Sequence, residues 1–336
     1  LLGNNCTIEN NQISYCNQAG IFAVGSGNIT SNYIFNIGLI VGQAYYGTFI
    51  NAIKVTNNNY VIQYNRINNS GYSGVNIAST CDIITIKNNF ITNVCLVLQD
   101  GGGIYTSGEG SARVIDGNII MNSIGNNSGT PNPTRFLARG IYLDELSSYT
   151  TVKNNTVANC AEAGYVIHKA HHNTLENNVS FNNGDGVYFL NNGGSYVYSN
   201  SLRGNIFFAK AAKQLSLRFA SGTDDIPKFG TASNNYYARP VDDDDVFLTY
   251  SPSTGTRYRT LASWQSFTGQ DLNSHKSPIT LTDTSRIDFY YNASTSNRVI
   301  TLPQPMIDVK GTKYSTSITL LPYTSAVLMV DPNPAS

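Results

Sequence analysis

The sequence is poor in charge and in long apolar runs. Only 12% of its 336 residues are charged, and 21 basic residues balance 21 acidic ones, so the formal net charge is zero. A neutral chain offers no electrostatic attraction for nucleic acid or for an anionic membrane, and we expect neither as a partner. No apolar stretch is long enough to cross a bilayer, so we expect no membrane span. The 22 tyrosines supply flat, half-polar surface, which suits core packing and sugar rings alike.

The most regular feature of the chain is a pair of residues, Asn-Asn in its full form, followed within two residues by an aliphatic side chain. The second Asn of each copy, or its equivalent, falls at positions 11, 32, 65, 89, 118, 155 and 178, which lie 21, 33, 24, 29, 37 and 23 residues apart. The short spacings fit one bare coil of a solenoid, and the long ones fit coils with insertions. A short alternating run precedes each copy and indicates a strand with one buried face. The pattern fades after Asn205 and Asn235.

A second marker, a Gly followed by an apolar residue, opens another strand eight or nine residues after the Asn in the plain coils. It occurs at Gly20, Gly74, Gly164 and Gly186. Coils with strands in the same order stack into a parallel β-helix, in which equivalent residues form ladders between coils. Asn suits the turns, because it tolerates left-handed backbone angles and its amide can bond the amide of the next coil. The sequence therefore predicts an all-β, right-handed parallel β-helix.

The predicted organisation has two parts. We expect residues 1–240 to form the solenoid, with further coils missing before Leu1, and residues 241–336 to form a C-terminal segment with a short amphipathic helix and a small antiparallel β domain. The acidic run 242–245 is interpreted as a solvated linker, with a calcium site as the alternative, and we expect no other cofactor. We expect a monomer.

Five cysteines cannot all pair internally. Cys16 and Cys160 lie five residues after their marker Asn, and Cys95 lies six after its own. Other coils place a small residue at this position, for example Ser70 or Ser123. We therefore interpret these thiols as interior ladder residues rather than as disulfides or metal ligands.

Alternation along the strands that follow each marker Gly predicts which side chains face outward. It places Asp144 and His168 at equivalent positions on neighbouring coils, with backbones about 4.8 Å apart. Tyr105, Tyr142 and Tyr188 stand on the adjoining row. A carboxylate and an imidazole beside three tyrosines would form a polar site with stacking platforms for a sugar. An incidental surface ion pair is the alternative.

Two insertions lie near this row, one ending in Gln99 to Gly103 and one that includes Ser128 to Arg135. Long loops on a solenoid commonly build a binding wall. Asp100 lies at the first insertion, before three consecutive glycines. Because glycoside hydrolysis uses two carboxyl groups, Asp100 and Asp144 are the candidate pair, with Glu145 as a third carboxyl. His168 is a candidate base, acid or orienting residue.

The segments Asp100-Gly101-Gly102-Gly103-Ile104-Tyr105 and Arg139-Gly140-Ile141-Tyr142-Leu143-Asp144-Glu145, with His168 and Asn177-Asn178, resemble right-handed parallel β-helix glycoside hydrolases, nearest to families 141 and 120. The resemblance spans most of residues 80–336. It implies hydrolysis of a plant-type or other complex polysaccharide or oligosaccharide by a secreted, cell-surface or periplasmic protein of bacterial type. It also implies that Asp100 and Asp144 occupy the acidic positions of those enzymes. We expect Tyr105, Tyr142, Tyr188 and Arg139 to contact the substrate.

Two other functions remain open at this stage. A polysaccharide lyase or phage-like depolymerase would need a cation beside an acidic sugar, and Arg139, Lys169 and Arg113 are the cations near the site. A carbohydrate-binding or adhesive solenoid would need only the outward tyrosines, because a fold alone does not establish catalysis.

Overall fold

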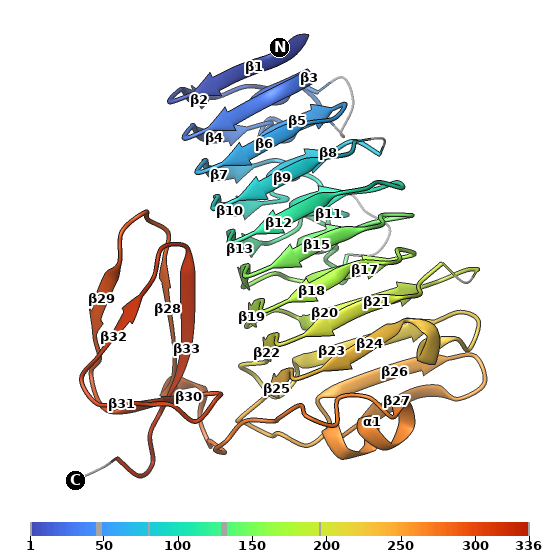
Figure 1. Ribbon diagram of the computed structural model, residues 1–336, viewed down its shortest axis with the longest axis vertical. Coiled ribbons are helices and arrows are strands. Elements are labelled where there is room, and N and C mark those ends of the chain that lie inside the picture. The colour runs from blue at the N-terminus through green and yellow to red at the C-terminus, as the bar shows by residue number, and fades with distance from the viewer. Residues whose placement is uncertain (1, 45–48, 80, 129–132, 195, 335–336) are drawn as a thin grey trace.

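The computed structural model describes residues 2–44, 49–79, 81–128, 133–194 and 196–334. Its main body is a stack of coils that rises along one axis, with the N-terminus at one end of the stack and α1 at the other (Figure 1). A small antiparallel domain lies beside the later coils. The predicted fold class is thereby confirmed, with parallel strands throughout the stack.

Each coil contributes strands to up to three faces of the stack. The first face contains β1 (Leu2–Glu9), β3 (Ile21–Thr30), β5 (Ile53–Thr56), β8 (Val75–Ile77), β11 (Gly101–Thr106), β14 (Ala138–Leu143), β17 (Ala163–His168), β20 (Asp185–Asn191), β23 (Leu215–Ser221) and β26 (Phe247–Ser251). The second face contains β6 (Tyr60–Gln63), β9 (Ile84–Lys87), β12 (Arg113–Asp116), β15 (Thr150–Lys153), β18 (Thr174–Glu176), β21 (Asn200–Arg203) and β24 (Gly230–Ser233). The third face contains β2 (Gln12–Ser14), β4 (Tyr33–Ile37), β7 (Arg66–Ser70), β10 (Phe90–Val94), β13 (Ile119–Ser123), β16 (Thr156–Ala158), β19 (Val179–Phe181), β22 (Ile206–Phe208) and β25 (Tyr236–Ala238). β1 and β3 bend to span the first two faces, since β3 pairs with both β5 and β6.

The marker asparagines form one continuous, buried ladder between the second and third faces. The side-chain amide of Asn118 donates to Asn155 Oδ1 at 2.9 Å, and that of Asn155 donates to Asn178 Oδ1 at 3.0 Å. Each Oδ1 also accepts the backbone N–H of the preceding ladder Asn. The ladder runs on to Asn205 and Asn235, where the sequence pattern was already fading, and there it meets Asp271 and Ser274.

The two residues of each pair have different tasks. The first takes the left-handed backbone angle, as at Asn88 (φ 52°), Asn154 (φ 55°) and Asn177 (φ 53°), and the second provides the buried amide. Less favourable residues occupy the first position in some coils, including Tyr64 (φ 56°). The sequence prediction assigned both tasks to Asn without separating the positions.

A second asparagine ladder follows the third face and was not predicted. Asn122, Asn159 and Asn182 all have positive φ, and their side chains bond one another at 3.2 and 2.8 Å. Sequence spacing alone did not distinguish this ladder, because many other asparagines lie near these positions.

The predicted inward and outward sides of the first face are confirmed. Ile141, Leu143 and Tyr165 belong to the solenoid core, whereas Tyr142 and Tyr188 belong to a separate cluster outside it. The five cysteines are free thiols, and Cys95 and Cys160 are buried, as expected for interior ladder residues.

The C-terminal segment begins with a strand that still belongs to the solenoid. β26 pairs in parallel with β23, so the predicted boundary after residue 240 falls before the last parallel strand. The rest of this segment contains β27 (Gly255–Arg259), α1 (Leu261–Thr268), a short 3-10 helix (Thr284–Arg286), β28 (Ile287–Asn292), β29 (Arg298–Thr301), β30 (Met306–Asp308), β31 (Lys313–Tyr314), β32 (Ser317–Leu320) and β33 (Thr324–Val330); a second 3-10 helix, Ile226–Lys228, lies in the solenoid before β24. The small domain packs on the third face, where Phe289 stacks on Phe181 at 4.7 Å between ring centroids.

Replacing a ladder amide should destabilise the stack. Asn155→Ala removes the acceptor for both donors of Asn118, which would remain buried, and we expect a loss of about 3 kcal/mol in the free energy of unfolding. Urea denaturation followed by circular dichroism measures it. The matched control is Asn154→Gly, which keeps the positive φ and loses one exposed hydrogen bond, to Asp116. Equal losses in the two variants would contradict the role of the buried ladder.

Candidate active site

Asp144 accepts three side-chain hydrogen bonds at the outward edge of the first face. Tyr105 Oη donates to Oδ2 at 2.8 Å, Tyr142 Oη donates to Oδ1 at 2.7 Å, and His168 Nδ1 lies 2.7 Å from Oδ1. β11, β14 and β17 supply these residues in register, since Tyr105 pairs with Tyr142 and Leu143 pairs with Ile167. The predicted association of Asp144 with His168 and two of the tyrosines is therefore present.

The other ring nitrogen of His168 is held by a residue that sequence reasoning missed. His168 Nε2 lies 2.9 Å from Asn192 Oδ1, an acceptor, so the ring is bonded on both sides. Asn192 follows β20, beyond the strand positions whose alternation predicts a direction. Asp144, His168 and Asn192 thus form a line across three successive coils.

The pair favours opposite charges. Burial by itself raises the pKa of Asp144, but hydrogen bonds from His168, Tyr142, the Glu145 N–H and Tyr105 outweigh it, and the pKa lies below its ordinary value. Burial lowers the pKa of His168, but bonding to Asp144 and Asn192 and the negative charge of Asp144 raise it overall. The two shifts have the same cause, and they favour an ionised carboxylate beside a protonated imidazole.

The tyrosines face outward as predicted, yet they are not open stacking platforms. Tyr142 is 2% exposed and Tyr188 is 7% exposed. The Arg139 guanidinium covers the Tyr142 ring at 4.1 Å, and Arg218 lies over Tyr188 at 5.1 Å. Alternation fixes only the side of the sheet on which a residue lies, not what then covers it. The burial of Tyr142 and Tyr188 contradicts their predicted role as open sugar platforms, and the Tyr105 and Tyr142 hydroxyls hold Asp144.

The predicted pair of Asp100 and Asp144 is not brought together. Asp100, whose side chain is 61% exposed, binds Arg139 Nη1 at 2.5 Å, and the Nε of the same guanidinium binds Glu162 at 2.5 Å. Asp100 lies just before Gly101, which pairs with Ala138, whereas Asp144 follows the other end of β14. Two side chains separate the two carboxylates. Arg139 binds Asp100 and covers the ring of Tyr142, and the Tyr142 hydroxyl donates to Asp144.

Glu145 turns away from Asp144, as strand alternation allows. Its carboxylate lies 2.9 Å from Lys169 Nζ on the next coil and is largely exposed. Glu145 therefore contributes a surface ion pair rather than a third carboxyl of the site.

Asp185 is a buried acidic residue that sequence reasoning also missed. It is buried on β20 beside Arg218, with Asp185 Oδ2 and Arg218 Nε 3.1 Å apart. Burial raises its pKa to about 7, Arg218 opposes the shift, and Glu162 adds to it. Asp185 lies in register with Ala163 and Arg139, so aligning the residues before each marker Gly would have found this row.

The cations that a lyase would require are already engaged within the protein. Arg139 lies between Asp100 and Glu162, and Lys169 binds Glu145. Arg113 is buried and donates to the carbonyl oxygens of Cys81, Gly108 and other residues of the loops around it. These contacts orient loops and leave little cationic charge for an acidic sugar.

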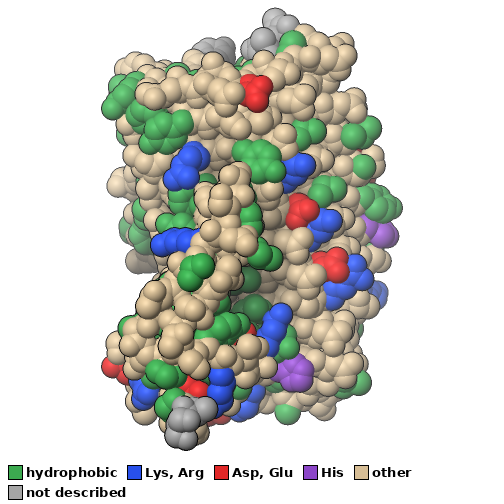
Figure 2. Space-filling view, turned by 60° about the vertical axis from the view of Figure 1, so that its left-hand side comes forward, with side chains coloured by type: hydrophobic (Ala, Val, Ile, Leu, Met, Phe, Trp, Pro, Cys, Tyr) green, Lys and Arg blue, Asp and Glu red, His purple; other side chains and the backbone are tan. Residues whose placement is uncertain are grey.

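Charge is dispersed over the rest of the molecule, and on the face in Figure 2 acidic and basic side chains are interspersed. In the acidic run, Asp243 binds Lys276 at 2.7 Å. Within the described ranges, no group of three or more His, Cys, Asp or Glu side chains could hold a metal ion, so the calcium alternative gains no support. Among the same residues, no helix is long and apolar enough to span a membrane.

Residues 51–216 match the family model described as the right handed beta helix region. The match includes the coils that carry Asp100, Asp144 and His168, and together with the parallel sheets it defines a right-handed parallel β-helix. Comparison with curated proteins and with solved structures gave no match.

The Asp144–His168 pair should be visible in the titration of His168. We expect a pKa above the ordinary value near 6.5 in the native protein and a lower one in Asp144→Asn, because the carboxylate favours the imidazolium. Nuclear magnetic resonance of the imidazole protons measures it, and Glu145→Gln is the control. An unchanged His168 pKa in Asp144→Asn would contradict the pairing.

The same shifts predict a pH range for the stabilisation. The folded pKa of His168 is raised, so its contribution is complete below about pH 6.5 and is lost as pH rises through the folded value. The folded pKa of Asp144 is lowered, so its contribution is present above about pH 3.9 and is lost as pH falls through the folded value. The difference in thermal stability between the native protein and His168→Ala, measured across this range, should follow that profile.

Proposed function

We propose that this protein hydrolyses glycosidic bonds of a complex polysaccharide at the outward edge of the first face. The observation that carries the proposal is the Asp144–His168–Asn192 line, in which a proton-carrying imidazole is oriented by an ionised carboxylate. The right-handed β-helix is common in glycosidases and lyases, and the resemblance of residues 100–105 and 139–145 to glycoside hydrolases points the same way.

The roles follow from the protonation states. His168, in its protonated form, donates its proton from Nε2 to the leaving glycosidic oxygen, after release from Asn192. The negative Asp144 holds Nδ1 and favours the positive charge that develops on the sugar ring in the transition state. A water molecule adds to the anomeric carbon as the bond from that carbon to the leaving oxygen breaks, and one proton of the water passes to the neutral His168 Nε2, which restores the imidazolium.

A lyase is the less favoured alternative, because Arg139, Lys169 and Arg113 are bound by groups of the protein itself. A purely adhesive solenoid would not need an imidazole bonded on both ring nitrogens. For a polymeric substrate we also propose a secreted or cell-surface location, where such a chain is encountered.

Substitution of His168 or Asp144 should strongly reduce turnover without unfolding the protein. We expect His168→Ala and Asp144→Asn to lower the rate of reducing-sugar release by about 10²-fold or more. Glu145→Gln, on the adjacent residue, should leave it within about twofold, because an exposed ion pair contributes little. Measurement uses a panel of soluble polysaccharides, with thermal unfolding to confirm folding.

Product chemistry separates the alternatives. Hydrolysis yields saturated ends, whereas a lyase yields an unsaturated sugar that absorbs in the ultraviolet. Native rates in both His168→Ala and Asp144→Asn would refute the assignment of the site, and absence of any cleavage by the native protein would favour the adhesive solenoid.

A further inference from the structure

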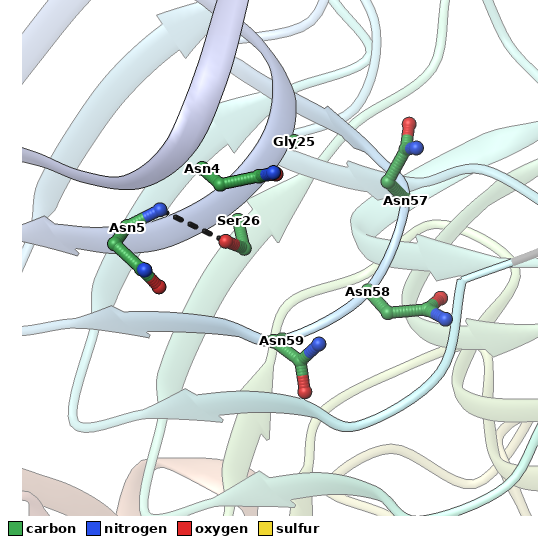
Figure 3. A pocket seen from close by; sticks show the side chains of 7 residues that line it. All are labelled: Asn4, Asn5, Gly25, Ser26, Asn57, Asn58 and Asn59. Atoms are coloured by element: carbon green, nitrogen blue, oxygen red, sulfur yellow. Dashed lines mark hydrogen bonds between the residues drawn. The ribbon is translucent and has the colours of Figure 1, made fainter.

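The corner between the first and second faces carries two neighbouring hollows. The first, of about 550 Å³, is lined by Asn4, Asn5, Ser26, Asn57, Asn58 and Asn59 (Figure 3). The second, of about 400 Å³, is lined by Asp82, Glu109, Ser111, Ser148, Tyr149 and His171. These residues come from successive coils, so the hollows follow the axis of the solenoid.

Asp82 joins the two hollows. Its backbone N–H donates to Asn58 Oδ1 in the first hollow at 2.7 Å, and its Oδ1 accepts the backbone N–H of Ser111 in the second at 2.5 Å. The two hollows therefore adjoin at Asp82, and together we call them the corner strip.

Polar groups in the strip have unused hydrogen-bonding capacity. Among the described residues, the side-chain amides of Asn57 and Asn59 have no hydrogen-bond partner. His171 is only 9% exposed, and its Nδ1 lies 3.0 Å from His172 Nδ1, while its Nε2 has no partner in the part of the chain that the structure describes. This ring nitrogen lines the hollow and is not a buried atom, so it can form a hydrogen bond with a hydroxyl group of a ligand.

Aromatic rings extend the strip onto the next coils. Tyr149 is 56% exposed and stacks one face on His172 at 4.9 Å, and Tyr198, 37% exposed, stacks on His171 at 4.6 Å. Exposed rings fixed in this way offer flat surface to the apolar face of a sugar at little entropic cost. They are the open platforms that Tyr142 and Tyr188 do not provide.

The charge of the strip selects the ligand. Asp82 and Glu109 form no ion pair among the described residues, and the nearby Arg113 is buried with its N–H groups bound by loop oxygens. Two carboxylates without an accessible cation accept hydroxyl hydrogen bonds and repel uronate or sulfate groups.

We infer that this corner strip binds an extended, uncharged polysaccharide chain along the solenoid axis. The inference rests on the proposed action on polysaccharide and names the class of chain. The loop 144–149 begins at Asp144 and ends at Tyr149, so a single short loop connects the strip to the proposed site.

Affinity electrophoresis through gels that contain neutral polysaccharides (xylan, glucan or mannan) or polygalacturonate tests the inference. His168→Ala serves as the parent, so that bound chains are not cleaved. We expect retardation by at least one neutral chain and none by polygalacturonate. Tyr149→Ala should weaken binding at least about fivefold, whereas Tyr258→Ala, a comparably exposed tyrosine on β27, should bind like the parent.

Glu109→Gln provides a second test. Loss of this carboxylate reduces the repulsion of an acidic chain, so we expect polygalacturonate to retard this variant. Glu9→Gln, at the end of β1 and outside the strip, is the control and should not be retarded. Retardation by polygalacturonate in the parent, unchanged binding in Tyr149→Ala, or no binding to any neutral chain would each overturn the inference. Binding by the native protein without cleavage would instead refute the proposed hydrolysis and leave the strip intact.

Discussion

The inter-coil bonds of the buried asparagine amides are the constraint on which the structure depends. Each amide joins the coil before it to the coil after it, and each Oδ1 also accepts a backbone N–H, so the position of one turn fixes the next. Side chains alternate along a strand, so a shift of one residue would turn the Asp144 row into the core. The ladder contains no catalytic group, but it keeps Asp144 and His168 in register across coils that differ in length by insertions.

A rigid sheet also explains why Tyr105 and Tyr142 donate hydrogen bonds to a carboxylate rather than forming an open platform for a sugar. The rows of the first face are too close for bulky neighbours to remain separate, so Tyr105 packs its edge on Tyr142 at 5.2 Å and Arg139 closes over the ring. Open aromatic surface appears instead at the corner, where the chain leaves the sheet and the loops around Tyr149 and Tyr198 point rings outward. Proton transfer and chain binding are thus proposed for neighbouring parts of the same loops.

Much of the fold and part of the site followed from spacing. The Asn and Gly markers located the turns, the alternation placed Ile141 inside and Tyr142 outside, and equivalence between coils put Asp144 beside His168. The predicted pairing of Asp100 with Asp144 was wrong because it was chosen on chemical grounds, namely that glycoside hydrolysis needs two carboxyl groups. The register of the strands was not used. Asn192, Glu162 and Asp185 were missed because alternation was applied only to the few residues that directly follow each marker Gly: Glu162 and Asp185 precede their marker Gly, and Asn192 lies beyond the end of β20.

The sequence by itself determined the parallel β-helix, the buried ladder and the side of the sheet on which each strand residue lies. These features depend on local periodicity and on a repeat that places equivalent residues of successive coils next to one another. Only the tertiary structure decided which outward groups touch, which rings are covered and which carboxylates lack a cation. Those properties depend on loops of unequal length folding back over the faces. The path of such loops is set by contacts between residues far apart in the sequence, as when Arg113 collects the carbonyl oxygens of several loops, and no spacing rule encodes them.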